Sequence, residues 1–277
     1  MLRRPFQGSN VKARPCQKSP GTGVAVQAGT APAAFRPSKP TLFDVPLSNH
    51  GARCRYIIYS KELESQIDIN SPKELGGLAS EQYLALSPEG KMPLLVLPDG
   101  TALPECEVIT QYLVAKYKGQ GPDLLPAEPE AAARAWLISR IHDQYVTPIQ
   151  ACMYRSMNID ERAAKIAELA RQLGILEGLV DGPHAVADAG GPTTADAALF
   201  PTLVFCKEIL CPIFGWEDLF KHRPKLGAYF AAMQADTAGA RVIKEVEGGL
   251  EPWKTGGRFK DMGILDHVAN PDFRWAY

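Results

Sequence analysis

The chain has 277 residues, of which 45% are hydrophobic and 22% are charged. This length allows one or two domains with a buried core, and the composition is that of an ordinary globular protein. The longest apolar stretch, around Ala197–Phe205, is far shorter than the roughly 20 residues that a membrane-spanning helix needs, and it contains Pro201. We therefore expect no membrane span.

The first forty residues differ in composition from the rest. They contain no Asp or Glu, since the first acidic residue is Asp44, but they carry seven Lys and Arg residues. A basic, acid-free composition is typical of an organelle transit peptide, so we predict a disordered transit peptide at residues 1–40. Because Pro and Gly disfavour the amphipathic helix of a mitochondrial signal, we expect a chloroplast location. The alternatives are a mitochondrial location, or a cytoplasmic one with a plain basic tail.

The remainder of the chain is acidic. Without those seven residues, 23 basic residues stand against 31 acidic ones, which gives a formal net charge of −8. Such a charge argues against a nucleic-acid partner. The six cysteines form no Cys-x-x-Cys pair and no Cys/His spacing typical of a metal site. We therefore expect no bound metal, a reducing compartment and mostly buried thiols.

Residues 41–118 alternate short strand patterns with helical ones. The expected elements are a strand at 41–45, a helix at 52–61, a strand at 67–69, an irregular stretch with at most two helical turns at 71–87, a strand at 91–97, a turn at 98–101, a return strand from 102 and a helix from 104 to 117. The first three form a β-α-β unit. This order predicts an α/β thioredoxin-like N-terminal domain.

The sequence after residue 129 has a helical pattern. Residues 119–129 contain Gly and three prolines and are read as a linker. In the stretch 159–179, apolar residues recur with a helical period, and the stretch 193–210 suits the centre of a helical bundle. The sequence thus predicts an all-α helical C-terminal domain at 130–248 and an irregular, aromatic-rich tail at 249–277.

Lys91-Met92-Pro93 stands at the expected start of a strand. If this proline is in cis, as in a thioredoxin-like fold, the preceding backbone turns outward. The N–H and C=O of Met92 could then pair with an extended peptide laid alongside. A trans proline at a strand edge is the alternative.

Glu105 and Cys106 follow Pro104 at the expected start of a helix. The first N–H groups of a helix lack internal partners and lie at the positive end of its dipole, which suits a carboxylate. Glu105 could pair with a nearby ammonium group. An amino-acid head group, which bears both charges, fits such a place, although an ordinary acidic helix start has the same pattern.

Ser48 lies five residues before Arg53, in the turn between the first strand and the first helix. A hydroxyl at this point could stabilise a thiolate on a bound ligand. A thiol whose pKa is near ~8.5 is mostly protonated at neutral pH, so such stabilisation matters. Helix capping, which Ser and Asn supply routinely, is the alternative.

Four motifs in this order resemble the glutathione transferase superfamily. The first is Ser48-xxxx-Arg53, and the second is the phrase SPEGKMPLL at 87–95, which is similar to the family's NPxGKxPxL. The third is the helix start ECEVITQYL at 105–113. The fourth is TTADAALFP at 193–201, in which Thr193 and Asp196 form a capping box. The resemblance covers roughly residues 41–245.

The resemblance implies a binding mode for glutathione as co-substrate. The tripeptide would lie along Lys91, Met92 and Pro93, with its γ-glutamyl end at Glu105 and Cys106. Cys106 stands where the family usually has Ser, and a thiol is a weaker hydrogen-bond donor than a hydroxyl.

The resemblance also implies a catalytic residue. Ser48 would donate a hydrogen bond to the glutathione sulfur, although Asn49 or His50 could take this contact instead. The turn has no cysteine, which counts against the thiol-transferase and dehydroascorbate-reductase classes. Cys54 lies within the helix and is read as a core residue rather than a nucleophile.

The pocket for the second substrate has the weakest pattern. The resemblance places it against the first helices of the second domain and the C-terminus. The candidates there are Arg140, Tyr145 and Tyr154, together with His142 and Trp253.

The predicted protein is a homodimeric glutathione transferase of detoxification. It would conjugate glutathione to small electrophiles or reduce organic peroxides. A non-catalytic binder of glutathione or apolar ligands, and a scaffold that kept the fold without the site, are the alternatives.

Overall fold

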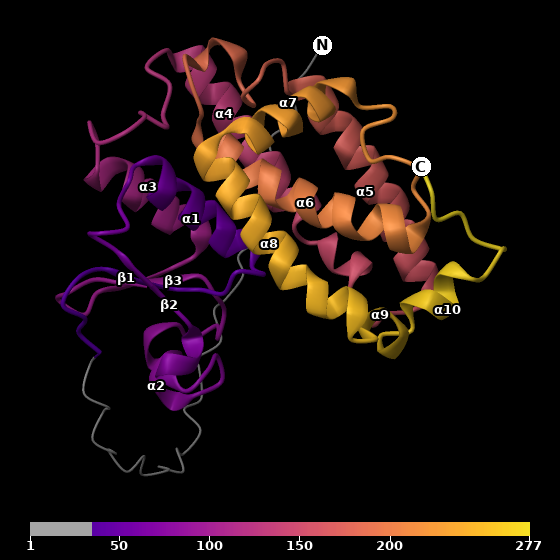
Figure 1. The fold of residues 1–277 in the computed structure, drawn as a ribbon, viewed down its shortest axis with the longest axis horizontal. Coiled ribbons are helices and arrows are strands. Elements are labelled where there is room, and N and C mark those ends of the chain that lie inside the picture. Colours follow the sequence, from indigo (N-terminus) through magenta and orange to yellow (C-terminus); the bar gives the residue numbers. More distant parts are fainter. Residues whose placement is uncertain (1–34) are drawn as a thin grey trace, which may run out of the picture. The chain divides into compact units, whose positions relative to one another are not determined.

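The first half of the chain forms a four-stranded mixed sheet (Figure 1). The computed structural model describes residues 35–277. The strands are β1 (Thr41–Phe43), β2 (Asp68–Asn70), β3 (Leu94–Val96) and β4 (Ala102–Pro104). Their order is β2-β1-β3-β4, in which β1 and β2 are parallel and the other pairs are antiparallel.

Helices cover both faces of this sheet. α1 (Asn49–Ser60) and α3 (Cys106–Lys116) pack on one face, which buries Leu42 and Leu95. A 3-10 turn at Pro72–Leu75 and the helix α2 (Glu81–Leu86) cover the other, which buries Phe43, Leu94 and Val96. Neighbouring strand residues therefore point to opposite faces, as the pleat of a strand requires. The predicted thioredoxin-like arrangement is confirmed.

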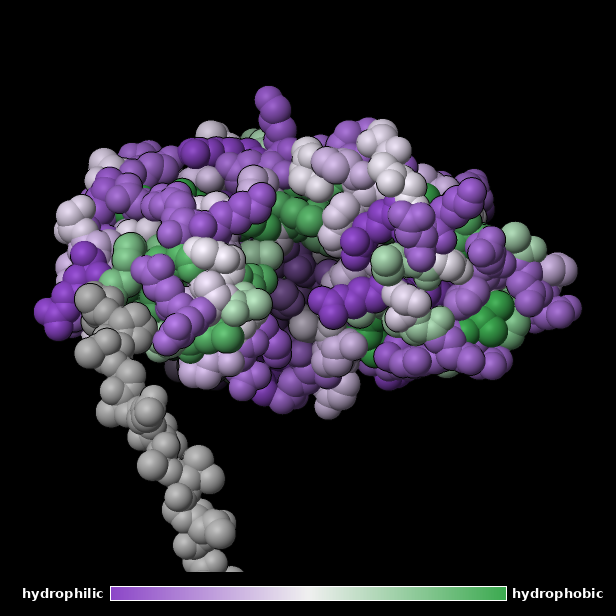
Figure 2. Space-filling view, turned by 90° about the horizontal axis from the view of Figure 1, so that it is seen from below, coloured by the Kyte–Doolittle hydropathy of each residue, from purple (hydrophilic) through white to green (hydrophobic). Residues whose placement is uncertain are grey.

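The second half of the chain is helical, as predicted. Its long helices are α4 (Pro129–Ile141), α5 (Ile159–Leu179), α6 (Thr194–Phe214), α7 (Pro224–Ala235) and α8 (Thr237–Thr255). α6 is the most buried of these and contacts α1, α4 and α8. Its start is fixed by the capping box of Thr193 and Asp196. The face drawn in Figure 2 is mostly polar, with apolar residues in separate areas.

α6 runs four residues beyond the expected end at 210, because Pro212 lies inside the helix without ending it. Its 21 residues make it long and apolar enough to cross a membrane by length and composition, although the apolar stretch at 197–205 alone is far too short for a span. Of its most apolar 18-residue window, 72% is buried within the protein, as in the core helix of a soluble domain.

The predicted end of the helical domain at residue 248 is wrong. α8 continues to Thr255, and two short helices, α9 (Arg258–Asp261) and α10 (Ile264–Val268), follow within the expected irregular tail. Gly249 lies inside α8, at a point where the helix passes very close to the turn after β1. A Cβ at Gly249 would lie 2.7 Å from the Cα of Leu47. Close packing, rather than a break in the helix, accounts for this glycine.

The predicted disordered segment 1–40 is too long at its C-terminal end. Residues 1–34 lie outside the described part of the chain, so the transit peptide itself stays a prediction. Residues 35–40 pack against the sheet: the Phe35 ring meets the Phe43 ring at 5.5 Å, and Lys39 pairs with Asp68 at 2.8 Å. An aromatic contact and an ion pair thus extend the domain upstream of β1.

Candidate active site

A cavity of about 320 Å³ opens where the approach to β3 meets the starts of α1 and α3 and the end of α4. Pockets for small molecules in proteins begin at about this size. The lining residues are His50, Ser87, Glu89, Lys91, Met92, Pro93, Pro104, Glu105, Cys106, Glu107, Arg140, Asp143 and Thr147. The structure thus brings together all five predicted glutathione-binding residues, and Arg140 joins them from the helical domain.

The backbone before β3 is open to a ligand. The predicted cis peptide bond between Met92 and Pro93 is confirmed. The ladder between β1 and β3 begins at Leu94, so Met92 is not paired with a neighbouring strand. Its backbone N–H and C=O lie at the cavity wall and are free to pair with an extended peptide.

Glu105 begins α3 with an unusual backbone conformation. Its φ of 72° is in the region that favours glycine, and among the described residues only Glu62 shares this feature without being glycine. No side chain caps this end of α3, so the first N–H groups of the helix lack side-chain partners next to the cavity. Non-glycine residues with positive φ cluster at ligand sites, and Glu105 fits that pattern.

Ser48, the predicted catalytic residue, does not line the cavity. Its Oγ accepts a hydrogen bond from the backbone N–H of Gly51 at 3.0 Å, which caps α1. Burial raises the pKa of the neighbouring Asp44 to about 6, against the lowering effect of Arg55. The hydroxyl of Ser48 is therefore engaged as the cap of α1, and its catalytic role stays a prediction.

Asn49, the second predicted catalytic residue, is buried away from the cavity. Its amide nitrogen donates to Gln150 Oε1 at 2.9 Å and to Thr202 Oγ1 at 3.1 Å. These contacts tie the first turn of α1 to the helical domain. Of the three residues that could contact a ligand thiol, only His50 lines the cavity.

The predicted pocket for the second substrate is only partly assembled. Arg140 lines the cavity, but Tyr145 is 53% exposed and lies outside it. The Tyr154 ring packs at 5.3 Å from Trp253 and 5.9 Å from Phe205, within an aromatic cluster. The cavity is instead bounded on the helical side by Arg140, Asp143 and Thr147.

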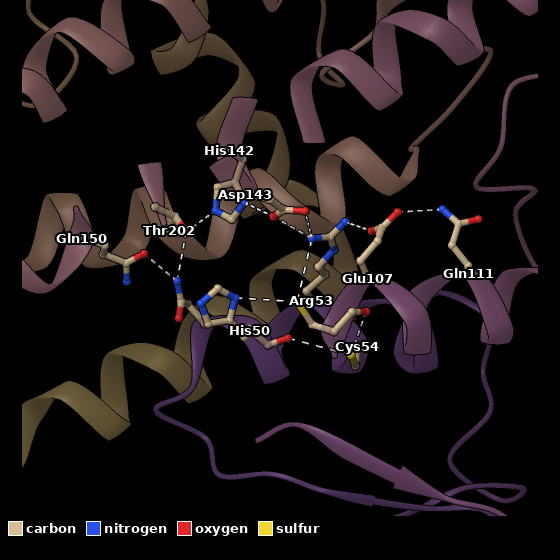
Figure 3. A network of polar contacts seen from close by, with 11 residues as sticks. His50, Arg53, Cys54, Glu107, Gln111, His142, Asp143, Gln150 and Thr202 are labelled. Atoms are coloured by element: carbon tan, nitrogen blue, oxygen red, sulfur yellow. Dashed lines mark hydrogen bonds and ion pairs between the residues drawn. The ribbon is translucent and has the colours of Figure 1, made fainter. Parts of the chain in front are cut away.

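Arg53 holds the inner wall of the cavity (Figure 3). Its side chain is 1% exposed and pairs with Glu107 of α3 and with Asp143, whose Oδ1 is 3.0 Å from Nη1. The same Nη1 is 3.9 Å from the Sγ of Cys106. Although burial alone would raise it, the hydrogen bond from His142 and the charge of Arg53 lower the pKa of Asp143 to about 2.

A chain of hydrogen bonds runs from Asp143 through His142 to Thr202 of α6 (Figure 3). Asp143 Oδ1 is 2.8 Å from His142 Nδ1, and His142 Nε2 is 2.7 Å from Thr202 Oγ1. Thr202 Oγ1 also accepts from Asn49. With Asp143 ionised, His142 donates to it from Nδ1. The chain therefore fixes α1 against the wall of the cavity.

His50 and Cys106 touch each other inside the cavity. The Nδ1 atom of His50 is 3.7 Å from the Sγ of Cys106. Burial, together with the positive charges nearby, lowers the pKa of His50 to about 4. Burial raises the pKa of Cys106 to about 11 despite the neighbouring Arg53. Both side chains are therefore neutral at pH 7.

Comparison with known proteins identifies the family. The family model described as "Glutathione S-transferase, N-terminal domain" matches residues 42–121. Glutathione S-transferase 3 of Zea mays is 36% identical over 104 residues, which are 36% of this chain and 45% of the maize protein. Glutathione S-transferase F10 of Arabidopsis thaliana is 30% identical over 175 residues, which are 58% of this chain and 77% of that protein. The chain belongs to the glutathione S-transferase superfamily.

Solved structures of this superfamily have the same fold. A rice glutathione S-transferase, solved in complex with glutathione, matches with a TM-score of 0.63 and 23% identity over 79% of this chain and 97% of that one. Glutathione is the co-substrate of the family. The chain spans less than half of the maize relative's length.

The sequence reasoning missed Glu107, Asp143 and Thr147 at the cavity and gave His50 only as an alternative. A signal for His50 was present: residues three and four apart on a helix share a face. His50, Arg53 and Cys54 have that spacing in α1 once the helix is known to start at Asn49. The expected start at residue 52 hid the pattern.

Proposed function

We propose that this protein is a glutathione transferase that conjugates the glutathione thiolate to small electrophiles or uses it to reduce organic peroxides. The observation that carries the proposal is the single cavity formed by the free backbone of Met92 and the uncapped start of α3 at Glu105. A backbone edge and a helix N-terminus, side by side, match a peptide that carries an amino-acid head group.

The polar groups of the cavity suit the charges of glutathione. Its γ-glutamyl carboxylate would bind the first N–H groups of α3, and its ammonium group would pair with the carboxylate of Glu105. The cysteinyl unit would pair with the backbone of Met92. Lys91 and Arg140, which also line the cavity, are cations available to the glycyl carboxylate.

The second substrate would enter from the helical side of the cavity. Arg140 and Thr147 lie there, and a cation beside the reacting atoms would stabilise negative charge that develops on an electrophile. The protein would thus act mainly through positioning and charge stabilisation.

A glutathione-affinity column and a conjugation assay with an aryl halide test the proposal. We expect retention on the column, elution by free glutathione and a conjugation rate above the uncatalysed one. Replacing Glu105 with Gln should weaken retention, whereas Glu62→Gln, at the other non-glycine residue with positive φ, is the matched control. Failure of the chain to bind glutathione would refute the proposal.

A non-catalytic glutathione-binding protein is the second candidate. The observation that favours it is the position of Ser48, whose hydroxyl caps α1 and does not line the cavity. Retention on the column without conjugation or peroxidase activity, over a range of aryl halides and organic peroxides, would support this candidate over the transferase.

We also propose a homodimer. Four large apolar side chains are 46–53% exposed on α3, α4 and the following turn: Val108, Trp136, Leu137 and Tyr145. Exposed apolar side chains of this size are costly in water and are common at interfaces between subunits. Sedimentation of the wild type should give the mass of two chains, and Trp136→Glu should shift it to one.

The chloroplast location stays a proposal that rests on the composition of the leader. A fluorescent protein fused to residues 1–34 tests it without removing Phe35, which packs against the sheet. We expect the signal in chloroplasts, and a diffuse cytosolic signal would refute the proposal.

A further inference from the structure

Two side chains compete for the role of thiol partner at the start of α1. Ser48 caps the helix, and its Oγ accepts a hydrogen bond from the backbone N–H of Gly51. Ser48 is absent from the lining of the cavity. His50, two residues later, lines the cavity and is not needed as a cap. The cavity therefore offers an imidazole to a bound thiol, whereas the hydroxyl of Ser48 lies outside the cavity lining.

The surroundings of Cys106 orient its thiol. Arg53 Nη1 lies 3.9 Å from the sulfur and, as a donor only, takes the accepting side of Sγ. His50 Nδ1 lies 3.7 Å from the same sulfur. Because Cys106 keeps its proton at neutral pH and Arg53 already takes the accepting side of Sγ, the S–H group is available as the donor in the contact with His50. The nitrogen Nδ1 then acts as the acceptor.

This contact sets the tautomer of His50. When Nδ1 of a neutral imidazole accepts a hydrogen bond, its proton is on Nε2. The Nδ1 atom of His50 faces the sulfur of Cys106, and Figure 3 shows the other ring nitrogen of His50 on the opposite side of the ring from the dashed line. Within residues 35–277, the structure gives this second nitrogen no hydrogen-bond partner from the protein. A donor is thus available at the cavity wall.

We propose that His50, with its tautomer fixed by Cys106, donates a hydrogen bond from Nε2 to the glutathione sulfur and stabilises the thiolate. This inference rests on the proposed function. It gives Cys106 a role beyond contact with the γ-glutamyl carboxylate, because the side chain at this position orients the imidazole of His50. His142, Asp143 and Arg53 are the other charged or titratable groups that act on His50.

The neutral state of His50 matters for this role. An imidazole stabilises a thiolate by donating one hydrogen bond and need not carry a charge, in the same way as a hydroxyl does. In the step itself, the glutathione S–H bond breaks, the proton leaves to solvent water, and the sulfur keeps the electron pair. His50 transfers no proton and returns unchanged.

The test measures the pKa of the thiol of protein-bound glutathione. This pKa is obtained from the ultraviolet absorbance of the thiolate as the pH is raised. The wild type should show a pKa at least about one unit below the value near 8.5 of a free thiol. His50→Phe keeps a ring but lacks the donor, so the pKa of the bound thiol should return to about 8.5. His50→Gln places an amide N–H near the position of Nε2 and should restore part of the shift.

Variants at Cys106 and Ser48 separate the proposal from its rival. Cys106→Ser keeps a donor to Nδ1 and should retain the lowered pKa, whereas Cys106→Ala should lose part of it. Under the proposal, Ser48→Ala leaves the pKa of the bound thiol at its wild-type value once circular dichroism has shown that it folds. His222→Gln, at an exposed histidine, is the control for loss of a histidine elsewhere.

The outcomes are distinct from those that test the proposed function. A wild type that does not bind glutathione refutes the function and, with it, the role of His50. A wild type that binds glutathione but loses the lowered pKa in Ser48→Ala and keeps it in His50→Phe overturns only the role of His50. Binding without any lowered pKa in the wild type also overturns that role and favours the non-catalytic binder.

Discussion

The two buried arginines of α1 differ in the kind of structure that they support. Arg55 pairs with Asp44 and Glu245, and donates to the carbonyl oxygens of Val45 and Pro46 at 2.8 Å each. It fixes the turn that carries Ser48. Arg53, two residues earlier, pairs with carboxylates that line the cavity. Arg55 thus stabilises the backbone of the turn after β1, whereas Arg53 positions side chains that line the cavity.

The carboxylates beside the two arginines behave in opposite ways. Asp44 is fully enclosed, and burial raises its pKa to about 6 in spite of Arg55. Asp143 is 20% exposed, and the hydrogen bond from His142 with the charge of Arg53 lowers its pKa to about 2, against the effect of burial. An ion pair therefore does not by itself fix the direction of a pKa shift, since desolvation competes with the attraction.

Removing the arginines one at a time should separate stability from binding. Arg55→Met leaves the carboxylate of Asp44 buried without its cation and should lower the free energy of unfolding by about 3–5 kcal/mol. Arg53→Met should lower it less, because Glu107 and Asp143 stay partly hydrated, but it should weaken glutathione binding at least tenfold. Urea unfolding and titration calorimetry measure the two effects. Equal losses of stability in the two variants would contradict the claim that Arg55 contributes more to stability than Arg53.

The pH dependence of stability should follow the raised pKa of Asp44. Between pH 4 and 6 the folded protein holds a proton on Asp44 that the unfolded chain has released. The free energy of unfolding should therefore fall by up to about 3 kcal/mol as the pH rises through this window. Asp44→Asn should abolish this fall in urea unfolding curves, and a fall that persists in the variant would contradict the assignment. Asp143 acts in a lower window, because its contribution is lost as the pH falls from about 4 to 2.

Cutting the hydrogen-bond chain should affect both domains moderately. Thr202→Val keeps the shape of the side chain but leaves Asn49 and His142 without their shared partner. We expect a loss of about 1–3 kcal/mol in the free energy of unfolding and a rise in the dissociation constant of glutathione. Thr194→Val is a matched control, since the buried Thr194 hydroxyl has no side-chain partner. Similar effects of both substitutions would argue against a role of the chain.

The smallest expected effect concerns Ser48. Loss of its cap in Ser48→Ala should cost about 1 kcal/mol in the free energy of unfolding. If the hydroxyl has only a structural role, the rate of conjugation at saturating glutathione should fall only in proportion to the fraction of the variant that is unfolded. A hundredfold or larger fall in that rate in fully folded Ser48→Ala protein would instead show that Ser48 has the catalytic role that its motif suggests.

Much of the fold could be predicted because local patterns and tertiary packing agree. α5 has the predicted bounds, since Asn158 caps its start and its apolar residues recur at helical spacing. The wall of the cavity at Met92, Glu105 and Cys106 was predicted from ordered motifs. α8 was cut short because the approach of Gly249 to Leu47 is a contact between distant segments, which no local pattern contains.

The inner part of the site could not be predicted for a similar reason. Whether Ser48 or His50 faces the cavity depends on where α1 begins, since Ser48 becomes its cap, and on the contact of His50 with Cys106 of α3. Tyr154 was a reasonable candidate by type, but the aromatic cluster with Trp253 draws it away from the cavity. Which side chains face the cavity thus depends on contacts that form only in the folded protein.

A crystal structure of the protein with glutathione bound tests the central claim most directly. We predict the γ-glutamyl carboxylate at the first N–H groups of α3, the cysteinyl unit against the backbone of Met92, and the sulfur in hydrogen-bond contact with His50. The hydrogen bond between Ser48 and Gly51 should be intact. A sulfur bound to Ser48 with this cap broken, or glutathione outside the cavity, would contradict the account.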